Sequence, residues 1–93
     1  MREKDIEQKL VKAVKQIGGM CLKFTSPGFD GVPDRLVLLP LGRKAFVELK
    51  APGKEPRPLQ LRRIQELSRL DFPCYVVDNE EMIGGIIDAI QAS

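Results

Sequence analysis

The sequence contains no histidine, and aromatic residues make up only 5% of its 93 residues. Without histidine, the commonest general base is absent, and so is any mechanism built on a histidine–metal or serine–histidine pair. Chemistry on this chain therefore has to use carboxylates, lysine, hydroxyl groups or a metal ion held by oxygen atoms.

Cysteine is scarce, and long apolar runs are missing. Cys21 and Cys74 each lie in an apolar, strand-like stretch, and neither belongs to a CxxC pair, so we expect small buried core residues and no zinc site. No apolar run approaches the roughly 18 residues that would indicate a membrane span. The N-terminus is charged from Arg2 onward and lacks a signal-peptide core, so we expect a cytoplasmic protein.

The remaining composition is typical of a globular protein. Hydrophobic residues make up 43% of the chain and charged residues 30%, and the length fits one domain spanning residues 1–93. The formal net charge of +2 favours a nucleic-acid partner without deciding the matter.

The hydrophobic pattern predicts an α/β fold. Helices are expected at about residues 5–17 and 58–70 and after a cap at Asp78 or Asn79, and strands at 20–25, 32–39, 43–50 and 73–77. The short gap between the second and third strands predicts a hairpin, and the helix before the fourth strand allows parallel pairing. We therefore expect the order αβββαβα, with a central mixed four-stranded sheet flanked by helices.

Three polar residues lie on the predicted hairpin. Asp34 follows Pro33 near the start of its strand, because proline cannot donate to a central ladder. Glu48 and Lys50 are two residues apart on the next strand, so they share a face. The alternative interpretations are a solvated acid at a strand end and a Glu/Lys pair on the wet side of a half-exposed strand.

In a hairpin, Asp34 and Glu48 can meet. Two adjacent carboxylates repel, and one of them would be driven to take up a proton. A divalent cation removes the repulsion, and Mg²⁺ prefers hard oxygen ligands of this kind. The carbonyl of Leu49 is a further candidate ligand, and Lys50 lies where it can orient a water molecule and offset negative charge.

The segments Pro33-Asp34 and Glu48-Leu49-Lys50 together resemble the PD-(D/E)xK nuclease motif. The whole chain resembles the stand-alone VRR-NUC family of phages and bacteria, and it is also similar to the archaeal Holliday-junction resolvases. The resemblance implies a restriction-endonuclease-like core and a single VRR-NUC-type nuclease domain at residues 1–93. It also implies Mg²⁺, with Mn²⁺ as a substitute, and cleavage of branched DNA, above all four-way junctions, in a bacterial cell or a phage-infected host.

Glu7 is a further candidate for the site. A helical wheel places it at the margin of an apolar face, between Val11 and Val14. The resemblance to the resolvases implies that Glu7 reaches the metal through water, whereas the VRR-NUC pattern would favour Glu3. Alternatively, both acids simply complement the helix dipole.

Gln60 is predicted to project into a buried arc formed by Leu61, Ile64 and Leu67. The resemblance implies that this amide faces the active site and contacts Lys50 or the substrate backbone. Alternatively, it is a glutamine at a helix start with its amide in water.

Basic residues flank the predicted site and are candidates for contacts with DNA phosphates. They are Lys23, Arg35, Lys54, Arg57, Arg62, Arg63 and Arg69. Each is otherwise an ordinary surface charge, and the few aromatic residues argue against base stacking as the mode of recognition.

Because a symmetric four-way junction needs two opposed cuts, a two-fold homodimer is expected. The alternatives are a structure-nonspecific or restriction-like phage DNA-processing nuclease, and a catalytically silent DNA-binding module.

Overall fold

The computed structural model describes residues 1–93 and has the expected αβββαβα order. Its elements are α1 (Glu3–Gln16), β1 (Met20–Lys23), β2 (Arg35–Leu38), β3 (Lys44–Leu49), α2 (Pro58–Arg69), β4 (Cys74–Val77) and α3 (Ile83–Ala92). Short 3-10 turns at Pro40–Gly42 and Glu80–Met82 precede β3 and α3. The largest difference from the sequence prediction is at β2, which begins after Pro33 instead of before it.

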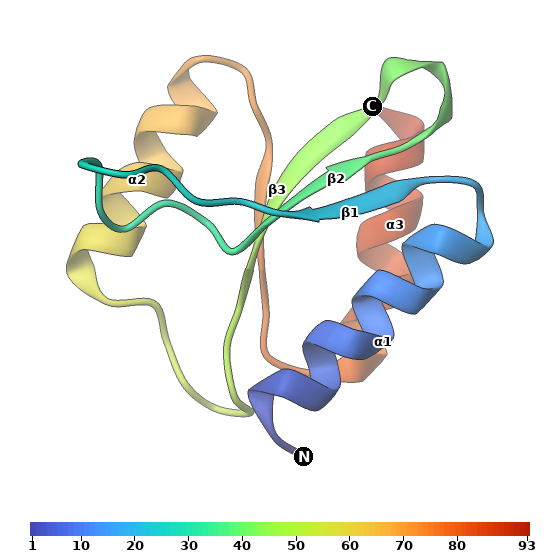
Figure 1. Ribbon diagram of the computed structural model, residues 1–93, viewed down its shortest axis with the longest axis horizontal. Helices are drawn as coiled ribbons and strands as arrows, with labels where there is room; N and C mark the ends of the chain where they lie inside the picture. The colour runs from blue at the N-terminus through green and yellow to red at the C-terminus, as the bar shows by residue number, and fades with distance from the viewer.

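The four strands form one mixed sheet in the order β1-β2-β3-β4. β2 pairs antiparallel with both β1 and β3, and β4 pairs parallel with β3 after the α2 crossover. The predicted hairpin and the mixed four-stranded sheet are therefore confirmed. Figure 1 shows the strands passing between α2 on the left and α1 and α3 on the right.

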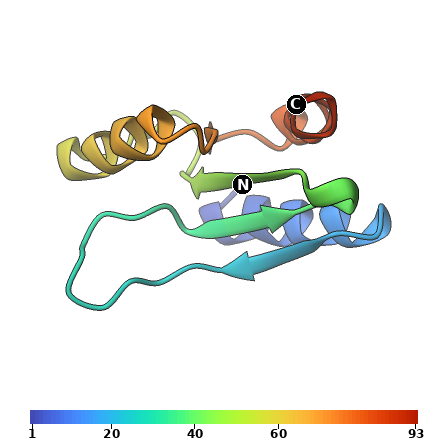
Figure 2. The same cartoon turned by 90° about the horizontal axis from the view of Figure 1, so that it is seen from above.

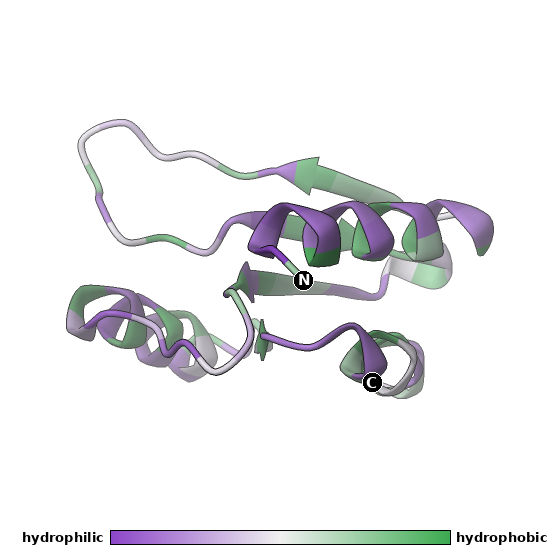
Figure 3. Cartoon of the chain, turned by 90° about the horizontal axis from the view of Figure 1, so that it is seen from below, coloured by the Kyte–Doolittle hydropathy of each residue, from purple (hydrophilic) through white to green (hydrophobic).

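One face of the sheet packs against α1 and α3 and forms the hydrophobic core. Alternate residues of β3, from Ala45 through Val47 to Leu49, point into it. The helices contribute residues at helical spacing, which are Ile6, Leu10 and Val14 from α1 and Ile83, Ile86, Ile87 and Ile90 from α3. In Figure 3, α1 is mostly hydrophilic, with hydrophobic positions recurring along one side, as this packing requires.

The opposite face is covered only in part. Figure 2 shows α2 and the long β1–β2 loop extending together to one end of the molecule, beyond the strands. Gln60 is the only buried residue of α2. The predicted buried arc is therefore wrong: Leu61 is 45% exposed, and Ile64 and Leu67 are only half-buried. The reason is that α2 extends beyond the strands instead of lying across the sheet.

Neither cysteine is fully buried, which corrects the expectation of two enclosed core residues. Both thiols are free and half-buried. Cys21 lies on β1 and Cys74 on β4, which are the two edge strands of the sheet. Partial burial still raises the pKa of both thiols, to about 11 at Cys74.

None of the helices combines the length and the apolar character needed to cross a bilayer.

The glycines make the packing of the helices testable. In the first turn of α3, a Cβ added at Gly84 or Gly85 meets nothing within 4 Å. Replacing either by alanine should raise the free energy of unfolding by about 0.5 kcal/mol, since glycine is a poor helix former. At Gly19 the same methyl group would lie 2.6 Å from the Leu38 carbonyl oxygen. Gly19→Ala should therefore destabilise the protein by about 1–3 kcal/mol. Urea unfolding measures both effects, and equal effects at the two places would contradict this packing.

Candidate active site

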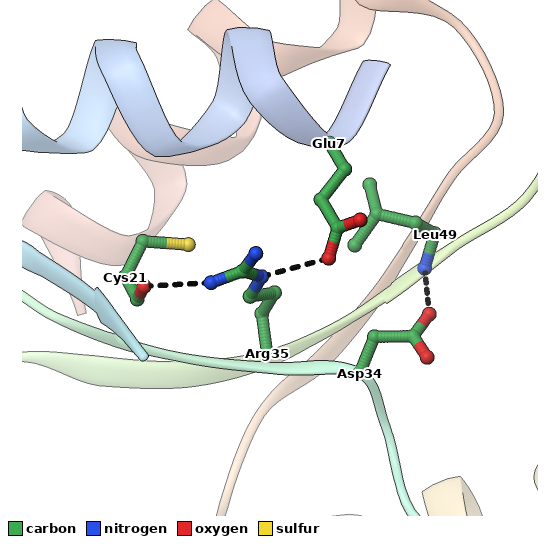
Figure 4. A network of polar contacts seen from close by, with 5 residues as sticks. All are labelled: Glu7, Cys21, Asp34, Arg35 and Leu49. Carbon is green, nitrogen blue, oxygen red and sulfur yellow. Dashed lines mark hydrogen bonds and ion pairs between the residues drawn. The ribbon is translucent and has the colours of Figure 1, made fainter. Parts of the chain in front are cut away.

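Asp34 and Glu48 lie side by side on the face of the sheet that α2 approaches. The register pairs Arg35 with Val47, so one residue further Asp34 stands opposite Glu48. Because Val47 points into the α1/α3 core, both acids point to the other face. Asp34 Oδ2 also accepts a hydrogen bond of 2.9 Å from the Leu49 amide, which ties the acid to β3 (Figure 4).

Glu48 is almost completely enclosed, with 1% of its surface exposed. Its Oε2 accepts a hydrogen bond of 2.5 Å from Gln60 Nε2 and lies 3.2 Å from Lys50 Nζ. Its Oε1 is buried and has no hydrogen-bond partner. A buried carboxylate oxygen without a partner is costly, so this atom is a candidate to take up a proton, a water molecule or a cation.

The surroundings of Glu48 favour its protonated form. Burial, first, and the neighbouring Asp34 carboxylate, second, raise the pKa of Glu48 to about 7, against the opposing effect of Lys50. Without a further cation, this carboxyl group therefore carries a proton in part of the molecules near neutral pH.

A hard divalent cation fits this donor set. Asp34 and Glu48 supply carboxylate oxygens, and the unpartnered Oε1 of Glu48 is a free acceptor beside Asp34. No three histidine, cysteine or acidic side chains lie together in a way that could hold a metal ion. The other ligands would thus be backbone oxygen, water or substrate, as is usual for Mg²⁺ at sites with one or two carboxylates.

Gln60 connects α2 to the two acids. Its Oε1 accepts a hydrogen bond of 2.8 Å from the Arg57 amide at the helix start, while its Nε2 donates to Glu48. Its amide is therefore buried and hydrogen-bonded through both its oxygen and its nitrogen, unlike a surface glutamine with its amide in water. The geometry brings Asp34, Glu48, Lys50 and Gln60 together.

Glu7 lies on the other face of the sheet. It reaches down from α1 to Arg35, with 2.8 Å between its Oε2 and the Arg35 Nε (Figure 4). Arg35 also donates to the Cys21 carbonyl oxygen at 3.1 Å. Arg35 faces α1 because it directly follows Asp34 and side chains alternate along a strand. The structure thus pairs Glu7 with Arg35 rather than with the two acids, and Glu3 is exposed on the first turn of α1.

The other predicted phosphate-binding residues divide into two groups. Lys23, Lys54, Arg57, Arg62 and Arg69 are exposed. Arg63 is engaged by the protein itself: its guanidinium lies 3.8 Å from the Phe29 ring centre, and its Nε donates to the Asp30 carbonyl oxygen at 2.8 Å. Its NH1 lies 2.9 Å from Glu66 Oε1.

Sequence reasoning missed this contact between Arg63 and the β1–β2 loop. The available signal was Phe29, an aromatic residue in an otherwise polar, glycine-rich loop.

Glu48 should make the metal-free protein less stable as pH rises. Its folded-state pKa of about 7 exceeds the reference value of 4.5, so ionisation disfavours the folded state. The free energy of unfolding should therefore fall between those pH values and level off above them, by at most about 3 kcal/mol. In urea unfolding with EDTA, Glu48→Gln should lose this dependence and be the more stable protein at pH 8. Equal pH profiles for the two proteins would contradict the assignment.

Comparisons with known proteins bear on the whole chain. No family model matches the sequence. Over 82 residues the chain is 50% identical to "Putative nuclease p44" of Acyrthosiphon pisum secondary endosymbiont phage 1, covering 88% of each protein. A solved structure described as "VRR_NUC domain" matches with a TM-score of 0.86 and 29% identity, covering 92% of this chain and 94% of that one. The sequence agrees with the first of these relatives and the fold with the second, and the chain belongs to the VRR-NUC family of nucleases.

Proposed function

We propose that this nuclease is a Mg²⁺-dependent endodeoxyribonuclease that hydrolyses phosphodiester bonds in branched DNA, with four-way junctions as its leading substrate and Mn²⁺ as a substitute ion. The observation that carries the proposal is the buried, unpartnered Oε1 of Glu48 beside the Asp34 carboxylate. Such a pair is unfavourable in the free protein and becomes favourable when a divalent ion binds.

Asp34 and Glu48 would hold the ion, with the Leu49 carbonyl as a further ligand. When bound, the ion supplies Lewis-acid stabilisation of the charge that develops on the phosphate. Gln60 fixes one oxygen of Glu48 through its hydrogen bond and leaves the other oxygen free for the ion. A Glu7 contribution through water would require release from its ion pair with Arg35.

Lys50 has the geometry of a group that acts on the attacking water or the phosphate. Its ammonium nitrogen lies 3.2 Å from Glu48 Oε2, and its side chain keeps limited access to solvent. From this position it orients a water molecule and offsets negative charge on the phosphate oxygens.

A symmetric four-way junction needs two cuts, and one chain offers one site. We therefore propose that two copies act as a two-fold homodimer. Within each copy, we propose that residues 1–93 form one domain. The isoleucines of α3 are buried, whereas Met20 and Leu22 on edge strand β1 are exposed. This favours β1 as the dimer surface. We place the activity in the cytoplasm of a bacterial or phage-infected cell.

A second candidate function is a structure-nonspecific nuclease of phage DNA processing. The phage origin of the relative named as a nuclease favours it. Cleavage of a four-way junction, a flap and a linear duplex of the same sequence separates the two functions.

Asp34→Asn should lower Mg²⁺-dependent cleavage at least about 100-fold, since even outer partners of a metal site are worth 10–100-fold. The asparagine Oδ1 can still accept the Leu49 amide, so folding and DNA binding in EDTA should be retained. The rise in melting temperature that Mg²⁺ or Mn²⁺ gives the wild type should be lost. The matched control is Asp30→Asn. Asp30 is exposed, and its hydrogen bond from Arg63 is accepted by its backbone carbonyl, which the substitution leaves in place. Wild-type cleavage by Asp34→Asn would remove this acid from the site.

Arg62 is exposed on α2 and should bind a DNA phosphate. Arg62→Ala should reduce the slope of log affinity against log salt by about 0.9, the change expected for one lost phosphate contact on duplex DNA. The control is Lys12→Ala, which removes an exposed charge from α1 on the other side of the sheet. Filter binding or fluorescence anisotropy between low and moderate salt measures the slope. The same slope in Arg62→Ala as in wild type would place α2 outside the DNA surface.

A further inference from the structure

A pocket of about 340 Å³ lies between the β1–β2 loop and α2. Its volume falls at the small end of the roughly 300–1,000 Å³ range of ligand pockets. Most of its lining is apolar, and the residues that carry the argument are Phe24, Phe29, Val32, Arg63 and Leu67. The catalytic proposal above gives this pocket no role.

The pocket adjoins the active site through both of its walls. On the sheet side, the Phe24 amide donates a hydrogen bond of 2.9 Å to the Asp34 carbonyl oxygen. The register Lys23–Arg35 places Phe24 opposite Asp34, so the Phe24 ring and the Asp34 carboxylate are neighbours on one face. Phe24 directly follows β1, Asp34 directly precedes β2 and Glu48 lies on β3, so the three form a row across neighbouring chain segments.

The α2 wall is continuous with the site as well. Arg63 and Leu67 follow Gln60 by three and seven residues, so all three lie on one side of the helix. Gln60 contacts Glu48, and Arg63 and Leu67 line the pocket. A DNA strand whose phosphate lies at Asp34 and Glu48 therefore has the pocket within reach of an adjacent base.

The chemistry of the pocket suits a flat aromatic ligand with polar edges. The Arg63 guanidinium stacks on Phe29 and is held in turn by the Asp30 carbonyl oxygen and by Glu66, so the ring is fixed. Phe29 nevertheless remains 47% exposed, which leaves ring surface open for stacking. The rim offers the guanidinium as a donor and Glu66 as an acceptor for the edge of a base.

We propose that this pocket receives one unpaired nucleobase of the DNA substrate, next to the phosphodiester bond that is cut. The inference rests on the proposed nuclease function and narrows its substrate class: among branched DNAs, four-way junctions included, those with an unpaired nucleotide at the branch point are preferred to those that are paired throughout. A base inside a duplex is stacked and cannot enter the pocket, whereas an unpaired base costs the least to turn out. The proposal departs from the expectation drawn from composition, because two of the five aromatic residues, Phe24 and Phe29, line this pocket.

The test is a binding measurement in EDTA, where no cleavage is needed. The probes are a duplex carrying one unpaired 2-aminopurine and the same duplex fully paired. Wild type should bind the unpaired probe more tightly and quench its fluorescence by stacking. Phe29→Ala should lower that preference by about 5- to 100-fold, the range set by loss of one base–aromatic stack. Phe29→Tyr should retain it, and so should the control Leu41→Ala, which removes an exposed apolar side chain outside the pocket.

Equal affinity of wild type for the two probes would overturn the proposal, and so would an unchanged preference in Phe29→Ala. Sedimentation of both proteins supplies the competing outcome: if Phe29→Ala alone becomes monomeric, the pocket holds a side chain of a second copy, and the proposal is also wrong. Cleavage by wild type in Mg²⁺ is scored separately. No cleavage of any DNA would overturn the nuclease mechanism, whereas cleavage with no preference for the unpaired probe would overturn only the base pocket.

Discussion

The structure depends on one electrostatic constraint, the enforced closeness of the Asp34 and Glu48 carboxyl groups. The β2–β3 register places them opposite each other, and the Leu49 amide holds Asp34 against β3. The Lys50 ammonium, 3.2 Å from Glu48 Oε2, offsets part of the repulsion between the two acids, and a proton or a divalent cation can offset the rest. Burial of Glu48, first, and the Asp34 carboxylate, second, raise the pKa of Glu48 to about 7 when no cation is bound.

One face of the sheet carries the hydrophobic core, and the other carries the candidate active site. The face that carries Val47 and Leu49 is sealed by α1 and α3 into an apolar core. The other face carries Asp34 and Glu48, and α2 approaches it with Gln60 against Glu48 and with Arg63 and Leu67 beside Phe24. Arg35 directly follows Asp34 but points to the core face, where it forms an ion pair with Glu7.

The sequence alone predicts the order of elements, the hairpin, the mixed sheet and the meeting of Asp34 with Glu48, because alternation and strand spacing are local properties. It also predicts a buried Gln60. It does not predict that α2 lies beside the sheet, since the apolar spacing of Leu61 and its neighbours is equally compatible with full burial. Arg63 and Phe29 are far apart in sequence, and their contact depends on where the β1–β2 loop folds back. The periodicity of a sequence predicts helices and strands but not contacts between such distant residues.

The most direct test of the central claim is the anomalous scattering of Mn²⁺ in crystals of the protein grown or soaked with that ion. The account predicts one ion bound by carboxylate oxygens of both Asp34 and Glu48, at distances near the roughly 2.0–2.2 Å typical of small divalent ions. An ion bound elsewhere, for example at Glu7 without the other two acids, would contradict it. So would two empty carboxylates at saturating Mn²⁺.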